Sequence, residues 1–363
     1  MDHRDHNLGD KAHSCSTFML TQGEALLVGH NLDEYIDIPG LVVVNKRGTS
    51  KMSIGWGELI AEGTAPLTRR GRFQWTSKYG SVTYTTRGRE CIDGGMNEVG
   101  LYIGEMTLMG TEYPEVPKVP RMYQVLWMQY LLDCFGTVAE VLAHLNDVQL
   151  EGTCQWHFFV SDRTAQAAVI EFLGKQPVIH TGSELPIPLV CNASYQAEME
   201  RLKQYAGFGG AIPIGSADDA DLRFIWGAQM LSAPGTLGQA PLERAWAILT
   251  RLQGESNRWG IIYDVRNARM HFRTNEAPEA RYIDFSSFDF SPGTPVLILD
   301  INEDLCGDVA NRFEVFTHTR NREFIARFWD EVDGGEEFNL AKSRLIEHSA
   351  QFIEAMDAGM MCA

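Results

Sequence analysis

The sequence lacks a long apolar run, closely paired cysteines and a basic cluster. No stretch of the 363 residues approaches the ~18 consecutive apolar residues that a membrane span needs. The seven cysteines are scattered and contain no CxxC pair, so neither a zinc site nor a disulfide framework is indicated. Lys and Arg number 31 against 48 Asp and Glu, and the resulting net charge of −17 would repel a polyanion. We therefore expect no membrane span, no metal site and no nucleic-acid partner.

What is present is the composition of a globular protein with a sizeable core. Hydrophobic residues make up 44% of the chain and charged residues 22%. The first segment, MDHRDHNLGDKAHS (1–14), is polar and lacks the apolar centre of a secretory signal. A cytoplasmic location is the default expectation.

Periodicity predicts an α+β chain rather than alternating βαβ units. Strand patterns fill the first third and begin with a hairpin around the turn TQGE (21–24). A second hairpin is predicted around Asn267. Helices are predicted at 121–134, 137–145 (with Thr137 and Glu140 as a capping box), after Ser216, and at 241–253, 311–331 and 338–356. No linker interrupts the pattern, so we expect one domain over residues 15–363.

Cys15 opens the first strand pattern, directly after the polar leader. A thiolate is a strong nucleophile but usually needs a neighbouring base. If the chain is cut between Ser14 and Cys15, the new α-amine lies beside the thiol and, with a pKa of about 7.7–8.0, can accept its proton. The alternative is a thiol packed inside the strand, which is the usual role of a free cysteine. Cys15 alone does not decide between the two.

Several segments, read together and in order, resemble the choloylglycine hydrolase family, which includes bile salt hydrolases and penicillin V acylases. The segments are CSTFML…GHNLDEY, KYGSVTYTT, DGGMNEVGLYIGEMTL, LVCNASYQAEM, DLRFIWGAQML and IIYDVRNARMHFRT. The resemblance spans about residues 15–275 and is most specific at DGGMNEVGL, which follows KYGSVTY. It implies the four-layer αββα sandwich of the N-terminal-nucleophile (Ntn) hydrolases, with two antiparallel sheets between helical layers. It also implies hydrolysis of a linear amide C–N bond without a metal or an organic cofactor.

The resemblance assigns roles residue by residue. Cys15 matches the nucleophile, and Asp33 in GHNLD matches the aspartate that holds the α-amine. Asn192 matches the side-chain donor to the oxyanion, and Thr107 falls where the family offers a backbone N–H as the second donor. Arg223 in LRFIW matches the arginine that organises the charges around the nucleophile. Loss of one oxyanion donor typically costs about 10²–10³ in rate.

The sequence departs from the family pattern at His30, where relatives usually carry arginine. A guanidinium stays charged, whereas an imidazole is charged only below about pH 6.5 unless it is perturbed. The stretch from Asn192 to Arg223 is shorter than in bile salt hydrolases that carry an assembly loop there, so a homo-oligomer is left open. Aromatic residues such as Trp75, Tyr84 and Tyr102 are expected in the core rather than in a pocket.

These features predict an amidohydrolase that acts on a small N-acyl amide through a thioester on Cys15. Residues 1–14 would be removed as a propeptide by attack of the Cys15 thiol on the preceding carbonyl carbon. Two alternatives remain at this point. An acyltransferase on the same scaffold would pass the thioester to an amine, and a non-catalytic member of the family would only bind its ligand.

Overall fold

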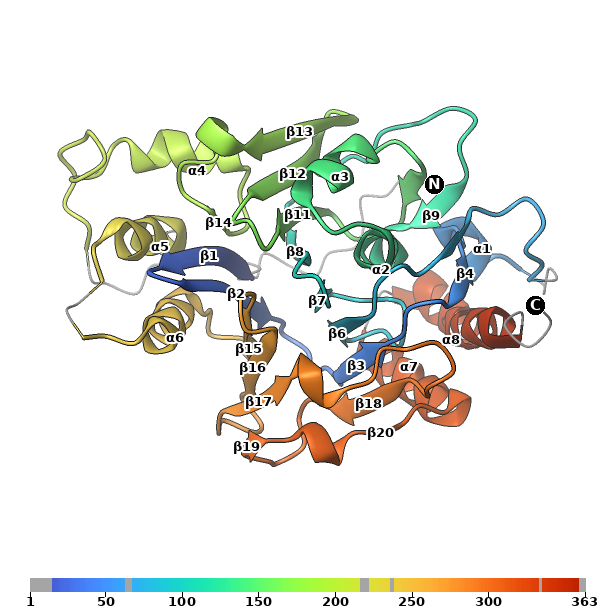
Figure 1. The fold of residues 1–363 in the computed structure, drawn as a ribbon. Coiled ribbons are helices and arrows are strands. Elements are labelled where there is room, and N and C mark those ends of the chain that lie inside the picture. Colours follow the sequence, from blue (N-terminus) through green and yellow to red (C-terminus); the bar gives the residue numbers. More distant parts are fainter. Residues whose placement is uncertain (1–14, 63–66, 216–221, 236–237, 333–334, 359–363) are drawn as a thin grey trace.

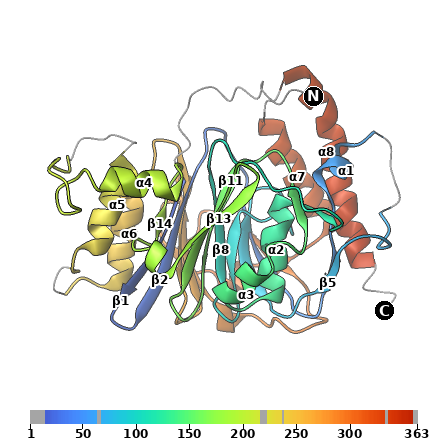
Figure 2. The ribbon, with the colours of Figure 1, turned by 90° about the horizontal axis from the view of Figure 1, so that it is seen from above.

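The chain forms four layers, with two β-sheets packed face to face between helices (Figures 1 and 2). This computed structural model describes residues 15–62, 67–215, 222–235, 238–332 and 335–358. The predicted leader, residues 1–14, lies outside the described residues, as does Ser216. The layers confirm the predicted αββα sandwich.

The first sheet contains the N-terminal hairpin, next to the edge strand β14. Its order is β14 (Leu189–Val190), β1 (Ser16–Gln22), β2 (Ala25–Asp33), β15 (Asn257–Asp264), β16 (Arg269–Thr274), β17 (Arg281–Asp284) and β19 (Gly307–Asp308). All neighbours are antiparallel except β17 and β19. Cys15 therefore lies directly before a strand that is paired on both sides.

The second sheet is antiparallel throughout. Its order is β13 (Gln176–Thr181), β12 (Ala167–Leu173), β11 (Trp156–Ser161), β8 (Tyr102–Thr107), β7 (Gly94–Asn97), β6 (Ser81–Thr85), β3 (Leu41–Asn45), β18 (Leu297–Asp300) and β20 (Glu314–Val315). Two small ribbons lie outside it, β4 (Ser50–Met52) with β5 (Gln74–Thr76) and β9 (Arg121–Tyr123) with β10 (Gln149–Glu151).

Helices cover the outer face of each sheet (Figure 2). The first sheet is covered by α4 (Tyr195–Leu202), α5 (Arg223–Ser232) and α6 (Pro241–Leu252). On the side of the second sheet lie α1 (Trp56–Ile60), α2 (Gln124–Cys134), α3 (Val138–Ala143), α7 (His318–Glu331) and α8 (Gly335–Ala358). No helix in the described ranges is long and apolar enough to cross a membrane.

The hairpin of β1 and β2 has the predicted turn. Ser16 pairs with Asn31 at its open end and Gln22 with Ala25 at its closed end. Gly23, with φ of 57°, supplies the left-handed conformation that a two-residue hairpin turn requires. The register places Asp33 just beyond the Ser16–Asn31 pair, next to Cys15.

Two tyrosine side chains pack directly against glycines where the two sheets meet. A Cβ on Gly94 would lie 2.2 Å from the Tyr84 hydroxyl, and one on Gly104 would lie 2.3 Å from the Tyr102 hydroxyl. These two hydroxyls are 3.2 Å apart and form a buried hydrogen bond. The glycines of the DGGMN motif and of β8 therefore make room for a polar contact inside the core.

Several predicted helix boundaries are wrong. Residues 121–123 form β9, so the helix predicted at 121–134 begins at Gln124. The helix predicted at 311–331 begins at His318, where the Thr317 side chain accepts a bond from the Arg320 N–H. The capping box of Thr137 and Glu140 is confirmed, with both reciprocal bonds present.

Candidate active site

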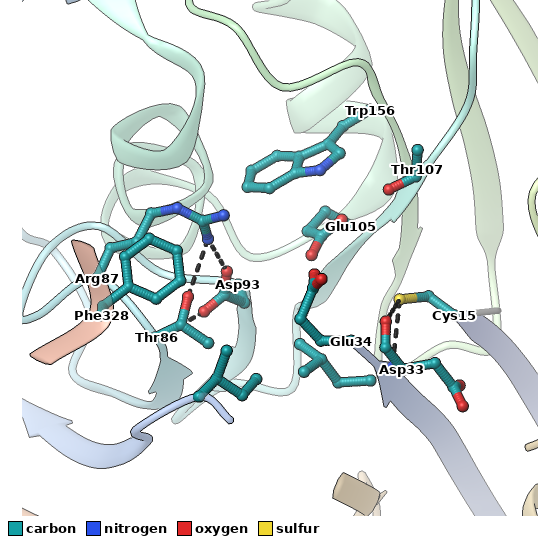
Figure 3. Close-up of a pocket in the computed structure, with 12 residues that line it drawn as sticks. Cys15, Asp33, Glu34, Thr86, Arg87, Asp93, Glu105, Thr107, Trp156 and Phe328 are labelled. Atoms are coloured by element: carbon teal, nitrogen blue, oxygen red, sulfur yellow. Dashed lines mark hydrogen bonds and ion pairs between the residues drawn. The ribbon is translucent and has the colours of Figure 1, made fainter. Parts of the chain in front are cut away.

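The Cys15 thiol is buried against the backbone at the end of β2. Its Sγ lies 3.5 Å from the Asp33 backbone N and 3.6 Å from the Asp33 carbonyl oxygen, so the sulfur both accepts and donates (Figure 3). Burial, with the nearby carboxyls of Glu105 and Asp33, raises the pKa of the thiol well above its ordinary value. In the intact chain Cys15 is therefore a neutral thiol.

Only one oxygen of the Asp33 carboxyl accepts a hydrogen bond from the described residues. Oδ1 accepts a hydrogen bond of 2.8 Å from the Gly254 N–H. Oδ2 is buried and has no hydrogen-bond partner among the residues that the structure describes. Burial raises the pKa of Asp33 to about 7, although the Gly254 N–H and the Arg223 charge act in the opposite direction. The site thus contains a buried carboxylate oxygen that lacks a donor.

Arg223 joins the nucleophile residue to Asn192. It is the first residue of α5, and its Nη1 donates to the Cys15 carbonyl oxygen at 3.3 Å. Its Nη2 donates to Asn192 Oδ1 at 2.9 Å. The other end of that amide, Nδ2, donates to the Thr107 carbonyl oxygen at 2.9 Å. One chain of hydrogen bonds therefore runs from Cys15 through Arg223 and Asn192 to Thr107.

The backbone N–H of Thr107 points away from the neighbouring strand β11. The next residue, Leu108, donates its N–H to Gln155, and backbone groups of successive residues alternate in direction along an antiparallel strand. Two residues earlier on the same edge, the Glu105 N–H bonds to the Asp93 carbonyl. β7 begins only at Gly94, beyond Asp93, so the Thr107 N–H lies at an edge that β7 does not cover.

A pocket opens beside Cys15 (Figure 3). Its apolar walls are Leu32, Ile38, Trp156 and Phe328, all of them buried. The remaining lining residues are polar or ionisable: Cys15, Asp33, Glu34, Thr86, Arg87, Asp93, Glu105 and Thr107. The thiol and Thr107 are thus part of the same pocket wall.

Arg87 and Asp93 form an ion pair with each other in this pocket. Arg87 Nη1 contacts Asp93 Oδ1, and the other carboxylate oxygen accepts from the Thr86 N–H (Figure 3). The guanidinium lies 4.7 Å from the Phe328 ring centroid and 5.1 Å from that of Trp156. The charge of Arg87 is therefore matched by Asp93 and its faces are covered by aromatic rings.

The structure brings five of the six predicted residues together and leaves His30 apart. His30 is fully buried between the sheets, where Nδ1 lies 2.7 Å from the Thr17 hydroxyl and the ring packs against Tyr84. Burial lowers the pKa of His30 to about 3, so its imidazole is neutral. His30 does not line the pocket. Trp75, Tyr84 and Tyr102 are buried core residues, as predicted.

Sequence reasoning missed most of the pocket. Glu34 lies in the segment GHNLDEY and Asp93 opens DGGMNEVGL, so both stand inside the segments that carry the resemblance. Glu105 lies inside the GEMT segment, where a carboxyl on a buried strand is the available signal. Phe328 comes from α7, far along the chain, and only the fold brings it here.

Comparison with known proteins identifies the family. The model of the linear amide C–N hydrolases of the choloylglycine hydrolase family matches residues 15–241 and begins at Cys15 itself. A penicillin V acylase from Pectobacterium atrosepticum is 23% identical over 262 residues, which is 60% of this chain and 69% of that protein.

Two solved structures share the fold. A penicillin V acylase from Agrobacterium tumefaciens superposes with a TM-score of 0.70 at 22% identity, covering 84% of this chain and 98% of that one. A conjugated bile acid hydrolase from Clostridium perfringens superposes with a TM-score of 0.66 at 16% identity, covering 80% and 98%. Since the family model covers well over half of the residues, the chain belongs to the choloylglycine hydrolase family of linear amide C–N hydrolases.

Proposed function

We propose that this chain is an Ntn cysteine amidohydrolase that cleaves an N-acyl amide after residues 1–14 have been removed. The observation that carries the proposal is the buried Asp33 Oδ2, which has no donor among the described residues and lies on the residue that contacts the Cys15 thiol. A cut before Cys15 would create an α-ammonium group at this place. A buried carboxylate without a partner is costly, and a new cation beside it would be stabilised.

Maturation would use the same thiol as the later reaction. The Cys15 Sγ attacks the carbonyl carbon of Ser14, and the acyl group moves from nitrogen to sulfur. Water then hydrolyses the thioester, which gives a carboxylate on Ser14 and a free α-amine on Cys15. The α-amine brings both a base and, when protonated, a positive charge to the buried thiol. Both effects favour the thiolate.

Amide hydrolysis would follow in two steps. The thiol proton passes to the α-amine as Sγ attacks the substrate carbonyl, and the resulting oxyanion is held by Asn192 Nδ2 and the Thr107 N–H. The α-ammonium then protonates the leaving amine, and a thioester remains on Cys15. Water, deprotonated by the α-amine, releases the acid. Arg223 positions Asn192 through its bond to Oδ1.

The test is intact-mass analysis combined with an amide panel. We expect the purified wild-type protein and the control Cys306→Ser, which changes an exposed thiol, to lack residues 1–14. Cys15→Ala should keep them and release no amine from any N-acyl amide. A stable, fully active protein that still carries residues 1–14, or amine release by Cys15→Ala, would contradict the proposal.

The same assay separates the alternatives. An added amine acceptor that is acylated faster than acid is formed would indicate an acyltransferase. Processed protein that is not labelled at Cys15 by an electrophilic lactone, and that binds ligand unchanged in Cys15→Ala, would indicate a binding protein. A cytoplasmic location and the oligomeric state stay predictions.

A further inference from the structure

Acidic residues outnumber basic ones in the lining of the pocket beside Cys15. Four of its side chains are carboxyls, Asp33, Glu34, Asp93 and Glu105, whereas Arg87 is the one basic residue among its described lining. Because Arg87 is held by Asp93 and covered by two aromatic rings, it does not neutralise the others. The pocket therefore has an excess of acidic groups.

Glu105 is the central member of this group. Its side chain is on β8, only 5% of the residue is exposed, and it faces into the pocket (Figure 3). Its Oε2 is buried and has no hydrogen-bond partner in the described part of the chain. Burial, together with the neighbouring Asp93, raises the pKa of Glu105 well above its ordinary value. A buried carboxyl oxygen of this kind is stabilised by a ligand that brings a donor or a positive charge.

Glu34 faces Glu105 across the pocket. The two carboxyl groups point toward one another from β8 and from the end of β2, on the side of Glu34 away from the Asp33 carboxyl (Figure 3). The backbone of Glu34 is fixed, since its N–H donates to the Ser256 carbonyl and its own carbonyl accepts from Arg258 Nε at 2.8 Å. Glu105 is thus presented by strand β8 and Glu34 by the position directly after β2, and both line the pocket next to Cys15.

A metal ion fits this arrangement poorly. No group of three or more His, Cys, Asp or Glu side chains in the described ranges is arranged to hold one. Two facing carboxyls within a wall of Leu32, Ile38 and Trp156 instead suit an organic cation, in which an ammonium group is attached to an apolar chain. An anionic substrate group would meet repulsion at the same place.

We propose that Glu105 and Glu34 form a subsite for a cationic nitrogen, so that the preferred N-acyl amide carries an ammonium or guanidinium group near the scissile bond. The inference rests on the proposed function, because it places the cation on the substrate of Cys15. The cation can belong to the acyl part or to the amine part of the amide. Matched substrates distinguish the two.

Turnover is compared in two series of amides, one that varies the amine part and one that varies the acyl part. The amine arm uses the phenylacetyl amides of 1,4-diaminobutane, pentylamine and 4-aminobutanoate, which are cationic, neutral and anionic. The acyl arm uses the butylamides of 6-aminohexanoic and heptanoic acid. We expect kcat/KM for the cationic member of one arm to exceed that of the neutral member by about 10- to 100-fold, as charge-assisted hydrogen bonds typically allow. Equal values in both arms would overturn the inference.

Glu105→Gln and Glu34→Gln test the residues. Each keeps the size of the side chain and removes its ability to ionise, and each should bring the cationic-to-neutral ratio close to one. The ratio is measured within one variant, so any effect of the change on the Cys15 thiol cancels. Glu184→Gln, at an exposed position outside the pocket, is the matched control and should keep the wild-type ratio. If both pocket variants keep the wild-type cationic-to-neutral ratio of kcat/KM, other residues cause the preference for cations and the inference is overturned.

Binding gives a readout that does not depend on hydrolysis. Butylammonium and the length-matched neutral 1-butanol are titrated into the wild-type protein and both variants by ligand-observed NMR. Preferential binding of butylammonium that is lost in Glu105→Gln supports the subsite even if no amide is cleaved, in which case only the proposed function fails. Equal binding of the two probes overturns the subsite, even if Cys15-dependent hydrolysis of neutral amides shows that the proposed function holds.

Discussion

The Arg223 guanidinium donates from Nη2 to the Asn192 side-chain oxygen at 2.9 Å. This contact decides which end of the Asn192 amide is the donor, because a guanidinium has no acceptor. Nδ2 is consequently turned toward Thr107, whose carbonyl it meets at 2.9 Å. Since Nδ2 has two N–H groups, one remains for a substrate oxygen beside the pocket.

Asn192→Asp should remove the donor while keeping the contact with Arg223. The new carboxylate would still accept from the guanidinium but would repel a developing oxyanion. We expect kcat to fall by about 10²–10³ or more, with little change in the melting temperature. Steady-state amine release measures the rate. Asn275→Asp, at an exposed position, is the control, and a variant Asn192→Asp with wild-type kcat would exclude the oxyanion role.

Thr107→Pro tests the backbone donor. Proline lacks the N–H, and at this position the N–H makes no ladder bond to β11. Thr107→Ala keeps the N–H and changes only the side chain. We expect kcat of the proline variant to lie about 10²-fold or more below that of the alanine variant. Far-ultraviolet circular dichroism checks that both variants keep the fold, and equal kcat values in the two would argue against this donor.

Asp33→Asn should stabilise the unprocessed chain at high pH. The pKa of Asp33 is about 7 in the folded state against 3.8 as its ordinary value. As pH rises from 3.8 to 7, the unfolded state loses its proton first, so the free energy of unfolding falls. The full loss is ~4 kcal/mol above pH 7, and an asparagine does not suffer it.

The measurement is urea denaturation in a Cys15→Ala background, in which no new α-amine forms. The stabilising effect of Asp33→Asn should grow by ~2–3 kcal/mol between pH 5 and pH 8. Comparing the two proteins at each pH removes the contributions of other titrating groups. An effect that does not vary with pH would mean that Asp33 is already ionised at pH 5.

Lys51→Met should destabilise the fold rather than change the chemistry. Lys51 is buried and its Nζ lies 2.6 Å from Glu90 and 2.9 Å from Asp133. Removing the ammonium leaves the buried Asp133 without its cation and Glu90 with Arg89 alone, and breaking a buried pair typically costs about 3–5 kcal/mol. Lys175→Met breaks an exposed ion pair with Glu115 and should leave the urea midpoint unchanged. Similar midpoints for the two variants would contradict this view of the buried network.

Local signals predicted the elements that hold the nucleophile. The hairpin around TQGE and the capping box of Thr137 depend on neighbouring residues alone, and both are present in the structure. Predicted helix boundaries were wrong where tertiary contacts compete with the local hydrophobic pattern. Residues 121–123 have a helical apolar spacing, but pairing with β10 holds them in a strand. α4 was not predicted, because its short sequence, YQAEMERL, overlaps the segment LVCNASYQAEM.

The site residues were predicted from sequence motifs, so side-chain orientation and burial, which motifs do not encode, were not predicted. The motifs singled out Cys15, Asp33, Thr107, Asn192 and Arg223, which the structure joins in one set of contacts, and their catalytic roles stay a proposal. They could not show that His30 faces the space between the sheets, since that depends on which side of β2 packs against Tyr84. Nor could they show that Glu105 is buried beside the thiol, because its burial comes from the packing of segments distant in sequence.

Phe328 of α7 forms part of the pocket wall, and this position has a consequence for substrate selection. Phe328 lies outside residues 15–241, the part that carries the family match, yet it lines the pocket that holds Cys15. The reacting groups and part of the surface that would select the substrate are therefore encoded in separate stretches of the gene. Under the proposed function, we expect substitutions in α7 to change the choice of amide while the contacts around Cys15 stay intact.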